Sequence, residues 1–211
     1  LQVLENINLS VEENAFVCLI GPSGSGKSTL LRTLSGLIEP TAGEIIFGAH
    51  HDQRPQTGLV FQQPNLMPWR TLEANIRLPL ELEGLPKPEV DQRTREVIEL
   101  AGLSGFEKSY PHELSGGMAQ RVAICRSLVQ DPEILLLDEP FGQLDALTRD
   151  KMGEELLRIW TEKQKTVLMV THSIPEAVYL ADRVLVLTQR PANISLELDI
   201  PLPRPRNETM R

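Results

Sequence analysis

A glycine-rich run near the start of the sequence constrains the fold more than any other feature. Its nine members are Gly21, Pro22, Ser23, Gly24, Ser25, Gly26, Lys27, Ser28 and Thr29. The apolar run at 15–20 before it is typical of a buried strand, and the pattern at 27–35 after it is typical of a helix. In that context the spacing Gly-x-x-x-x-Gly-Lys-Ser predicts a loop that binds the phosphates of a nucleotide.

Each residue type in this loop has a chemical reason to be there. Glycines let the backbone curl so that successive N–H groups point at phosphate oxygens, and the following helix adds the positive end of its dipole. Lys27 offers a full positive charge to the β- and γ-phosphates, and the Ser28 hydroxyl can ligate Mg²⁺. An ordinary glycine-rich turn is the alternative, and the strand and helix on either side argue against it.

Two carboxylates follow a second apolar run. The run at 134–137 reads Ile-Leu-Leu-Leu and is followed by Asp138 and Glu139. Ligands of open α/β sheets bind outside the carboxyl ends of the strands, so both acids are expected near the phosphate loop. Asp138 suits Mg²⁺ or its water shell, and Glu139 suits a water that attacks the γ-phosphate. Without the loop, a solvated strand end would explain the pair equally well.

Three further signals are weaker when each is taken alone. Ser115, Gly116 and Gly117 precede a helical run at 122–129, so they predict a helix N-terminus that can bind an anion. Taken alone, a simple capped helix is the better interpretation. Gln62 and His172 each follow an apolar run, where a phosphate site would lie. A lone polar residue there is more often part of the ordinary surface, although His172 can donate a hydrogen bond to a γ-phosphate.

The order of predicted elements indicates an α/β fold. Apolar strands alternate with amphipathic helices in the last third, which predicts a mostly parallel sheet covered on both faces. Strands are also expected at 1–10 and 43–47, and the segment from 201 onward is expected to be loose. We therefore predict a phosphate-loop NTPase core at about 1–70 and 131–200, with N-terminal antiparallel β strands and an inserted helical lobe at about 71–130.

Composition excludes several classes of partner. The formal net charge is −8 and Lys and Arg form no run, which argues against nucleic acid. No apolar run approaches the ~20 residues that span a bilayer, so the chain is expected to dock on a membrane protein rather than cross the membrane itself. Cys18 and Cys125 lie in apolar stretches and are interpreted as small core residues.

The order of these motifs over nearly the whole chain resembles the nucleotide-binding subunit of ATP-binding cassette (ABC) transporters. The resemblance implies one nucleotide-binding domain over 1–211 that forms a head-to-tail dimer around two ATP molecules. The phosphate loop of one copy and the turn at 115–117 of the second copy would grip each ATP. It also implies that the family's adenine-stacking aromatic lies before Leu1.

The same resemblance implies a role for each remaining residue. Gln62 would contact Mg²⁺, sense the γ-phosphate and relay closure to a transmembrane permease. Glu139 would be the catalytic carboxylate, and His172 would hold the γ-phosphate and the attacking water. Asp145 would lie in the loop that crosses between the two copies and would help to hold ATP.

Three runs, at 61–69, 138–149 and 171–177, are similar to the nitrate/sulfonate/taurine importer branch of the family. That similarity implies import of a small solute such as nitrate, a sulfonate or taurine. It also implies an extracytoplasmic solute-binding protein as an indirect partner. The chain would then be peripheral, at the cytoplasmic face of a bacterial inner membrane. Met118 and the run Gly142-Gln143-Leu144 depart from the commonest residues of the superfamily.

Three other function classes fit the sequence less well than a subunit of an ABC importer. An ABC-type ATPase acting on DNA or ribosomes would be expected to carry a coiled-coil insertion, a second cassette or basic surfaces. A regulatory module with little turnover would not need both Glu139 and His172. A phosphate-loop kinase leaves the run at 114–120 unexplained. The segment at 64–69 is predicted to receive a helix of the permease, and the alternative is that Trp69 fills the core of the helical lobe.

Overall fold

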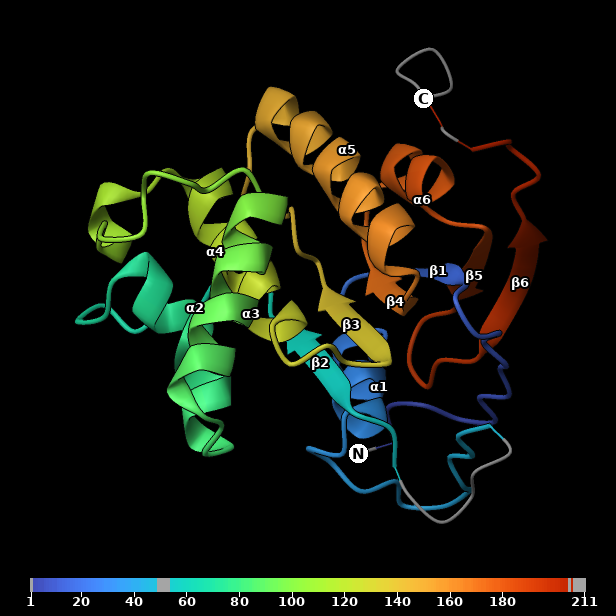
Figure 1. Cartoon of the computed structure of the whole chain (residues 1–211). Coiled ribbons are helices and arrows are strands. Elements are labelled where there is room, and N and C mark those ends of the chain that lie inside the picture. Colours follow the sequence, from blue (N-terminus) through green and yellow to red (C-terminus); the bar gives the residue numbers. More distant parts are fainter. Residues whose placement is uncertain (1, 49–53, 205, 207–211) are drawn as a thin grey trace. The chain divides into compact units, whose positions relative to one another are not determined.

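The computed structural model (Figure 1) describes residues 2–48, 54–204 and 206. Contacts between its residues divide the chain into two compact units. The first, called the sheet unit, comprises residues 1–59, 133–139 and 165–211. The second, called the helical unit, comprises residues 60–132 and 140–164.

The sheet unit is built on a six-stranded sheet in the order β2-β3-β4-β1-β5-β6. Its strands, in chain order, are β1 (Phe16–Ile20), β2 (Thr57–Val60), β3 (Ile134–Asp138), β4 (Thr166–Val170), β5 (Arg183–Leu187) and β6 (Ile194–Asp199). Strand β1 pairs in parallel with β4 and β5, and β3 pairs in parallel with β4, whereas β6 is antiparallel to β5. The continuous apolar sequences of β1, β3 and β4 fit strands that are buried on both faces, whereas β6 is an exposed edge strand.

Two helices pack on this sheet. Helix α1 (Lys27–Leu34) contacts β3 and β4, and α6 (Ile174–Leu180) contacts β1. Leu30 and Leu31 of α1 are buried in the same apolar cluster as Val17 and Leu19 of β1. Because both ends of the glycine-rich loop are anchored in one core, the loop is held between the carboxyl end of β1 and the first turn of α1.

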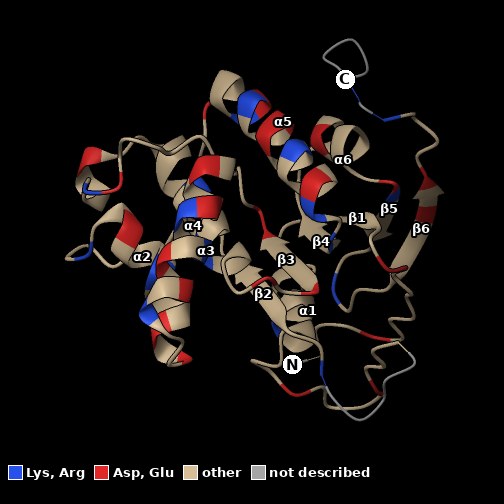
Figure 2. Cartoon of the chain, viewed as in Figure 1, with Lys and Arg blue, Asp and Glu red and all other residues tan. Residues whose placement is uncertain are grey.

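The helical unit contains α2 (Leu72–Leu82), α3 (Lys87–Leu100), α4 (Gly116–Leu128) and α5 (Ala146–Lys163), with a short 3₁₀ turn at Pro111–Glu113. Helix α4 contacts the other three helices. One face of α3 is buried, at Val90, Thr94, Val97 and Ile98. Positive and negative side chains are interspersed along α3 and α5 (Figure 2), as expected for solvated helix faces.

The strands predicted at 1–10 and 43–47 are not found among the described residues. In the first stretch only Leu4 makes a β-bridge, to Ala192, and Asn6 adopts a positive φ of 51° that interrupts an extended chain. In the run at 43–47, Ile46 is 60% exposed, so this run lacks the burial that would stabilise it as a strand. The prediction of N-terminal antiparallel strands was therefore wrong. The antiparallel strand at the edge of the sheet is β6.

The segment after residue 201 was predicted to be loose, and this too was wrong for Arg204 and Arg206. Arg204 donates to Asp182 Oδ1 and to the Leu180 carbonyl, both at 2.7 Å. Arg206, 7% exposed, donates to the carbonyls of Tyr179 and Ala181 at 2.9 and 2.7 Å. The last carbonyls of a helix have no intrahelical partner, so the two arginines satisfy the end of α6 and fix this part of the chain.

Both cysteines lie in the interior, as predicted. Cys18 and Cys125 are free thiols at 0% and 1% exposure. Burial raises the pKa of the Cys125 thiol to about 12 and that of Cys18 well above its usual value. Separately, within the part of the chain that the structure describes, no helix has the length and apolarity needed to cross a membrane.

Candidate nucleotide site

The glycine-rich loop depends on a backbone conformation that other residues disfavour. Gly26, the residue before α1, has a φ of 102°. A Cβ atom there would lie 2.6 Å from Val3 Cγ1 and 2.9 Å from Leu4 Cδ2, which is closer than real contacts allow. Glycine is therefore required at this position both by the positive φ and by the close approach of the N-terminal segment.

The first turn of α1 offers free donors of the kind that bind phosphate. Gly26 has no side chain to cap the helix, and the first turn carries no acidic residue. Among the described residues, the Ser25 hydroxyl is buried and has no hydrogen-bond partner. Uncapped N–H groups at the positive end of a helix dipole, beside an unpaired buried hydroxyl, fit an anion with several acceptor oxygens.

Lys27 is held over the loop by two carbonyl groups. It is 6% exposed, and its Nζ donates to the Gly21 carbonyl at 3.0 Å and to the Pro22 carbonyl at 2.9 Å. Arg190 donates to the Gly24 carbonyl at 2.8 Å from the segment after β5. Two of the three lysine protons are thus engaged and one remains for a ligand. Arg190 was missed from the sequence because no motif marks it.

The Ser28 hydroxyl donates to Asp138 Oδ1 at 2.8 Å, which brings together two of the three residues predicted to hold a metal. Asp138 is 7% exposed. Burial raises the pKa of the Asp138 carboxyl, and the nearby Glu139 raises it further, while Ser28, Arg32 and Lys27 lower it. A buried carboxylate beside a hydroxyl is a pair of hard oxygen donors, whose negative charge a divalent cation would offset.

Glu139 and His172 meet just beyond this pair. Strands β3 and β4 are parallel neighbours with Asp138 opposite Val170, so the residues that follow them emerge at the same edge of the sheet. The Glu139 N–H donates to the Val170 carbonyl at 2.9 Å, and His172 Nδ1 lies 3.3 Å from Glu139 Oε2. This contact is an ion pair only when the imidazole is protonated. The two side chains are therefore in contact at the edge of the sheet where β3 and β4 end.

In the helical unit, the turn at 115–117 begins α4. The Ser115 side chain accepts from the Met118 N–H at 3.2 Å and caps the helix, while Asp145 caps α5 by accepting from the Thr148 N–H at 3.0 Å. Hydrogen bonds from the side chain and the N–H of Thr148 lower the pKa of Asp145. A Cβ atom on Gly117 would lie 2.9 Å from Thr148 Cγ2, so glycine allows the two helix N-termini to pack closely.

The residues predicted for the site therefore fall in two sets. The phosphate loop, Asp138, Glu139 and His172 belong to the sheet unit and converge there, whereas Gln62, the turn at 115–117 and Asp145 belong to the helical unit. Gln62 is two residues beyond the end of β2. The predicted roles of the second set stay predictions.

Trp69 lies at the surface of the helical unit. Its exposed fraction is 72%, which excludes the alternative that it fills the core of this unit. The segment that carries it is nevertheless well fixed, because Asn75 of α2 hydrogen-bonds both the N–H and the carbonyl of Met67. A large aromatic side chain held out on an ordered segment is a feature of contact surfaces.

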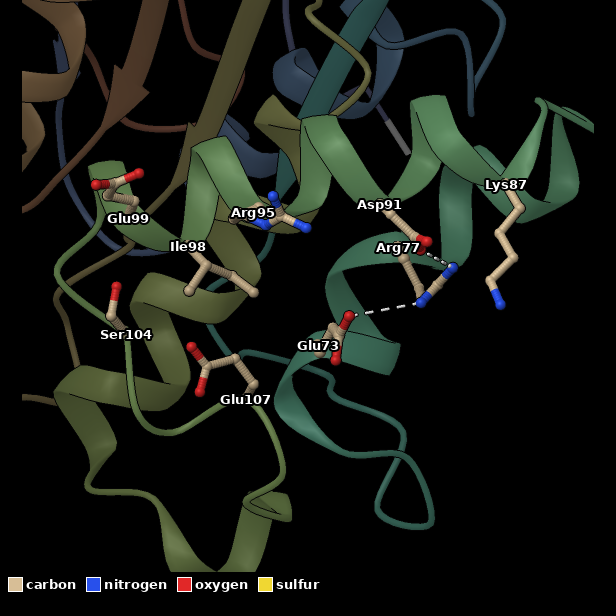
Figure 3. A pocket seen from close by; sticks show the side chains of 9 residues that line it. All are labelled: Glu73, Arg77, Lys87, Asp91, Arg95, Ile98, Glu99, Ser104 and Glu107. Atoms are coloured by element: carbon tan, nitrogen blue, oxygen red, sulfur yellow. Dashed lines mark hydrogen bonds and ion pairs between the residues drawn. The ribbon is translucent and has the colours of Figure 1, made fainter.

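The helical unit also contains a cavity of about 620 Å³ between α2, α3 and the loop that follows α3 (Figure 3). Arg77 on its wall is neutralised by Asp91 at 2.7 Å and by Glu73 at 3.5 Å. The lining residues are Glu73, Arg77, Lys87, Asp91, Arg95, Ile98, Glu99, Ser104 and Glu107. They include none of the residues predicted to hold nucleotide, and their mixed charges favour no one class of ligand.

Comparison with known proteins agrees with this geometry. A family model described as ABC transporter matches residues 4–142. The chain is 52% identical over 210 residues to an uncharacterized ABC transporter ATP-binding protein of Methanocaldococcus jannaschii, covering 99% of this chain and 79% of that protein. It is 48% identical over 210 residues to the aliphatic sulfonates import ATP-binding protein SsuB of Bacillus cereus, covering 99% and 82%.

Two further similarities are informative. The nitrate import ATP-binding protein NrtD of Synechocystis sp. is 46% identical over 214 residues, covering 99% of this chain and 80% of that protein. A solved dimeric ATP-binding cassette in a post-hydrolysis state, bound to ADP and Pi, is 36% identical with a TM-score of 0.80, covering 94% of this chain and 90% of that one. The family and the fold class predicted from the sequence are confirmed, and the chain belongs to the ABC transporter family.

Proposed function

We propose that the chain is the ATP-hydrolysing subunit that powers an importer of a small solute such as a sulfonate, nitrate or taurine. The observation that carries this proposal is the convergence of the phosphate loop, Asp138, Glu139 and His172 at one edge of the sheet. The similarity to a sulfonate-import and a nitrate-import ATP-binding protein supports the class of cargo. It also supports the proposal that the whole chain, 1–211, acts as one nucleotide-binding domain.

The sheet unit fits the triphosphate of ATP and its metal. The unpaired Ser25 hydroxyl, the uncapped first turn of α1 and the remaining Lys27 proton would hold the phosphates. Ser28 and Asp138 would hold Mg²⁺, with Gln62 as the third predicted contact, because hard oxygen donors suit this ion. When bound, Mg²⁺ supplies positive charge that stabilises negative charge developing on the phosphates.

Glu139 and His172 are the residues proposed to act in hydrolysis. Glu139 would accept a proton from, or orient, the water that attacks the γ-phosphorus. His172 lies 3.3 Å from Glu139 and would hold the γ-phosphate and that water through its other ring nitrogen. His172 is 58% exposed at its side chain and Glu139 23%, so both remain accessible to a ligand.

The second half of each ATP site would come from another copy of the chain. Ser115 and Gly116 are exposed at the start of α4, where the helix offers N–H groups and its positive dipole end. Asp145 lies beside this turn at the start of α5. The similarity to a dimeric cassette supports a dimer in which these groups contact the γ-phosphate bound by the partner copy.

A transmembrane permease is the proposed membrane partner, and it would place the chain at the cytoplasmic face of the membrane. The exposed Trp69 and its ordered segment support a contact with a permease helix. An extracytoplasmic solute-binding protein would act indirectly by delivering the solute. No contact with nucleic acid is proposed.

Two experiments test this function. The first compares the MgATP hydrolysis of the purified chain with that of Glu139→Gln, and a similar rate in both would contradict the proposed role of Glu139. The second co-expresses the chain with its permease and solute-binding protein in vesicles and measures ATP-dependent uptake of labelled sulfonate, nitrate and taurine. Uptake without ATP would contradict the proposed role in powering import, and uptake of none of these solutes with ATP would contradict the proposed cargo class.

Trp69→Ala tests the permease contact. It is expected to abolish co-purification with the permease while leaving the hydrolysis of ATP by the isolated chain unchanged. Normal assembly and transport with this variant would remove Trp69 from the contact. Leu196→Ala is a matched control, since Leu196 is also an exposed apolar residue, at 49%, but lies on β6 of the sheet unit.

A further inference from the structure

The segment at 64–70, called the docking segment below, is fixed by side chains from two helices. Asn75 of α2 has 0% exposure and uses its whole amide for this purpose. Its Oδ1 accepts from the Met67 N–H at 2.7 Å, and its Nδ2 donates to the carbonyls of Met67, Arg70 and Thr71 at 3.2, 3.0 and 3.0 Å. Asn75 therefore joins the end of the docking segment to α2.

Helix α4 holds the other end of the docking segment. The Arg126 guanidinium donates through Nη1 to the Asn65 carbonyl and through Nη2 to the Pro64 carbonyl, both at 2.9 Å. Two parallel bonds from one planar group to consecutive carbonyls fix both distance and direction. Burial lowers the pKa of Arg126, but an arginine starts so far above neutral pH that the group stays charged.

A second side chain of α4 reaches the residue just before Gln62. Gln120, which is 2% exposed, donates through Nε2 to the Phe61 carbonyl at 3.5 Å. Residues 120 and 126 are about 9 Å apart along the helix axis, so α4 contacts the chain on both sides of Gln62. The same helix begins with the turn at 115–117. One stiff helix thus joins the predicted γ-phosphate turn to the segment that carries Trp69.

We propose that Arg126 is a positioning residue that makes the docking segment move together with α4, so that a shift at the turn at 115–117 is transmitted to Trp69. This inference rests on the proposed function. A lone hydrophobic side chain could fill the same space but would not fix the direction of the backbone at Pro64 and Asn65. The charged, bidentate contact is what makes the docking segment follow the helix.

The matched control is another arginine of the same helix. Arg121 also donates to a backbone carbonyl, that of Ala101 at 3.0 Å, but this contact joins α4 to the end of α3 rather than to the docking segment. Arg121→Gln and Arg126→Gln therefore remove the same kind of bond from the same helix. Only Arg126→Gln is expected to uncouple Trp69 from movements of α4.

Trp69 itself is the reporter. In the 211-residue chain carrying Trp160→Phe, Trp69 is the one remaining tryptophan, since these 211 residues include two. Its emission is recorded as MgATP is added, while ATP affinity is measured separately with a fluorescent ATP analogue. We expect ATP to change the Trp69 emission in this parent, and Arg126→Gln to reduce the change about fivefold or more with ATP affinity unchanged. Arg121→Gln is expected to behave as the parent.

Arg126→Lys provides a second, milder test, because one ammonium group can still reach one of the two carbonyls. It is expected to give an intermediate response, and it decides the question if Arg126→Gln does not fold. A full response in both Arg126 variants, an equal loss in Arg121→Gln, or no response in a parent that binds ATP would each overturn the inference. A parent that fails to bind ATP would instead refute the proposed function.

Discussion

The amide of Asn75 gives the most quantitative prediction. Its oxygen accepts one hydrogen bond, its two N–H groups are shared among three carbonyls inside the helical unit, and it has no exposed surface. A hydrogen bond contributes about 0.5–1.5 kcal/mol net, so the loss of three of them in Asn75→Ala is expected to lower the free energy of unfolding by about 3 kcal/mol. For a chain of this length, that loss corresponds to roughly 9 °C in the melting temperature.

Asn75→Asp should cost more than Asn75→Ala. The aspartate keeps the acceptor for the Met67 N–H but loses both donors, and it places a second oxygen against the carbonyls of Arg70 and Thr71. The substitution also buries a negative charge without adding a cation to pair with it, which lowers the free energy of unfolding. The order of stability is therefore expected to be parent, then Ala, then Asp.

The assay is thermal unfolding followed by circular dichroism, together with hydrogen exchange of the Met67 amide. Both variants should exchange faster at Met67. Gln92→Ala is a matched control, since the Gln92 side chain is exposed and donates to Glu96 Oε1 at 3.0 Å on the helix surface. A melting temperature for Asn75→Ala within about 2 °C of the control would refute the assignment of three effective hydrogen bonds.

Four other substitutions or treatments follow from the structure. Glu139→Gln should lower kcat for MgATP by about 10²–10⁴-fold with little change in ATP affinity, and a rate near that of the parent in a phosphate-release assay would contradict its role. Asp138→Asn should abolish Mg²⁺-dependent hydrolysis yet raise the melting temperature, because it removes a buried charge; a lower melting temperature would contradict this. Gly26→Ala should destabilise the chain by roughly 1–3 kcal/mol through its positive φ alone and should abolish ATP binding, so tight ATP binding by this variant would show that the loop tolerates a side chain. At pH 8 the folded chain should resist thiol alkylation, because burial raises the pKa of Cys125 to about 12 and the reactive thiolate is scarce below that pH; rapid labelling of Cys125 without denaturant would contradict its burial.

Local signals in the sequence were sufficient where an interaction lies close along the chain. The run at 16–20, the loop and α1 are consecutive, so the strand, turn and helix could be assigned from periodicity and glycine spacing alone. The inserted helical lobe was predicted from periodicity in the same way, and Val90 and Val97 lie on the buried face of one of its helices. The sequence also predicted that Asp138 and Glu139 end a strand, since the apolar run before them is continuous.

Interactions between residues far apart along the chain could not be predicted from such local signals. The run at 43–47 was predicted as a strand, but strand formation needs a partner, and none is found for it among the described residues. The segment after 201 looked loose because its prolines and arginines match no periodic pattern. Its order comes from carbonyls of α6 more than twenty residues earlier, which attract Arg204 and Arg206.

The sequence by itself determined the chemistry of this protein, because a phosphate loop, a strand ending in two acids and a serine-glycine turn each form from neighbouring residues. The tertiary structure decided which of these groups touch. The contact of Ser28 with Asp138 spans 110 residues, and the contacts of Arg126 with Pro64 and Asn65 span 62 and 61. Such pairings depend on how strands and helices pack, and no local pattern encodes them.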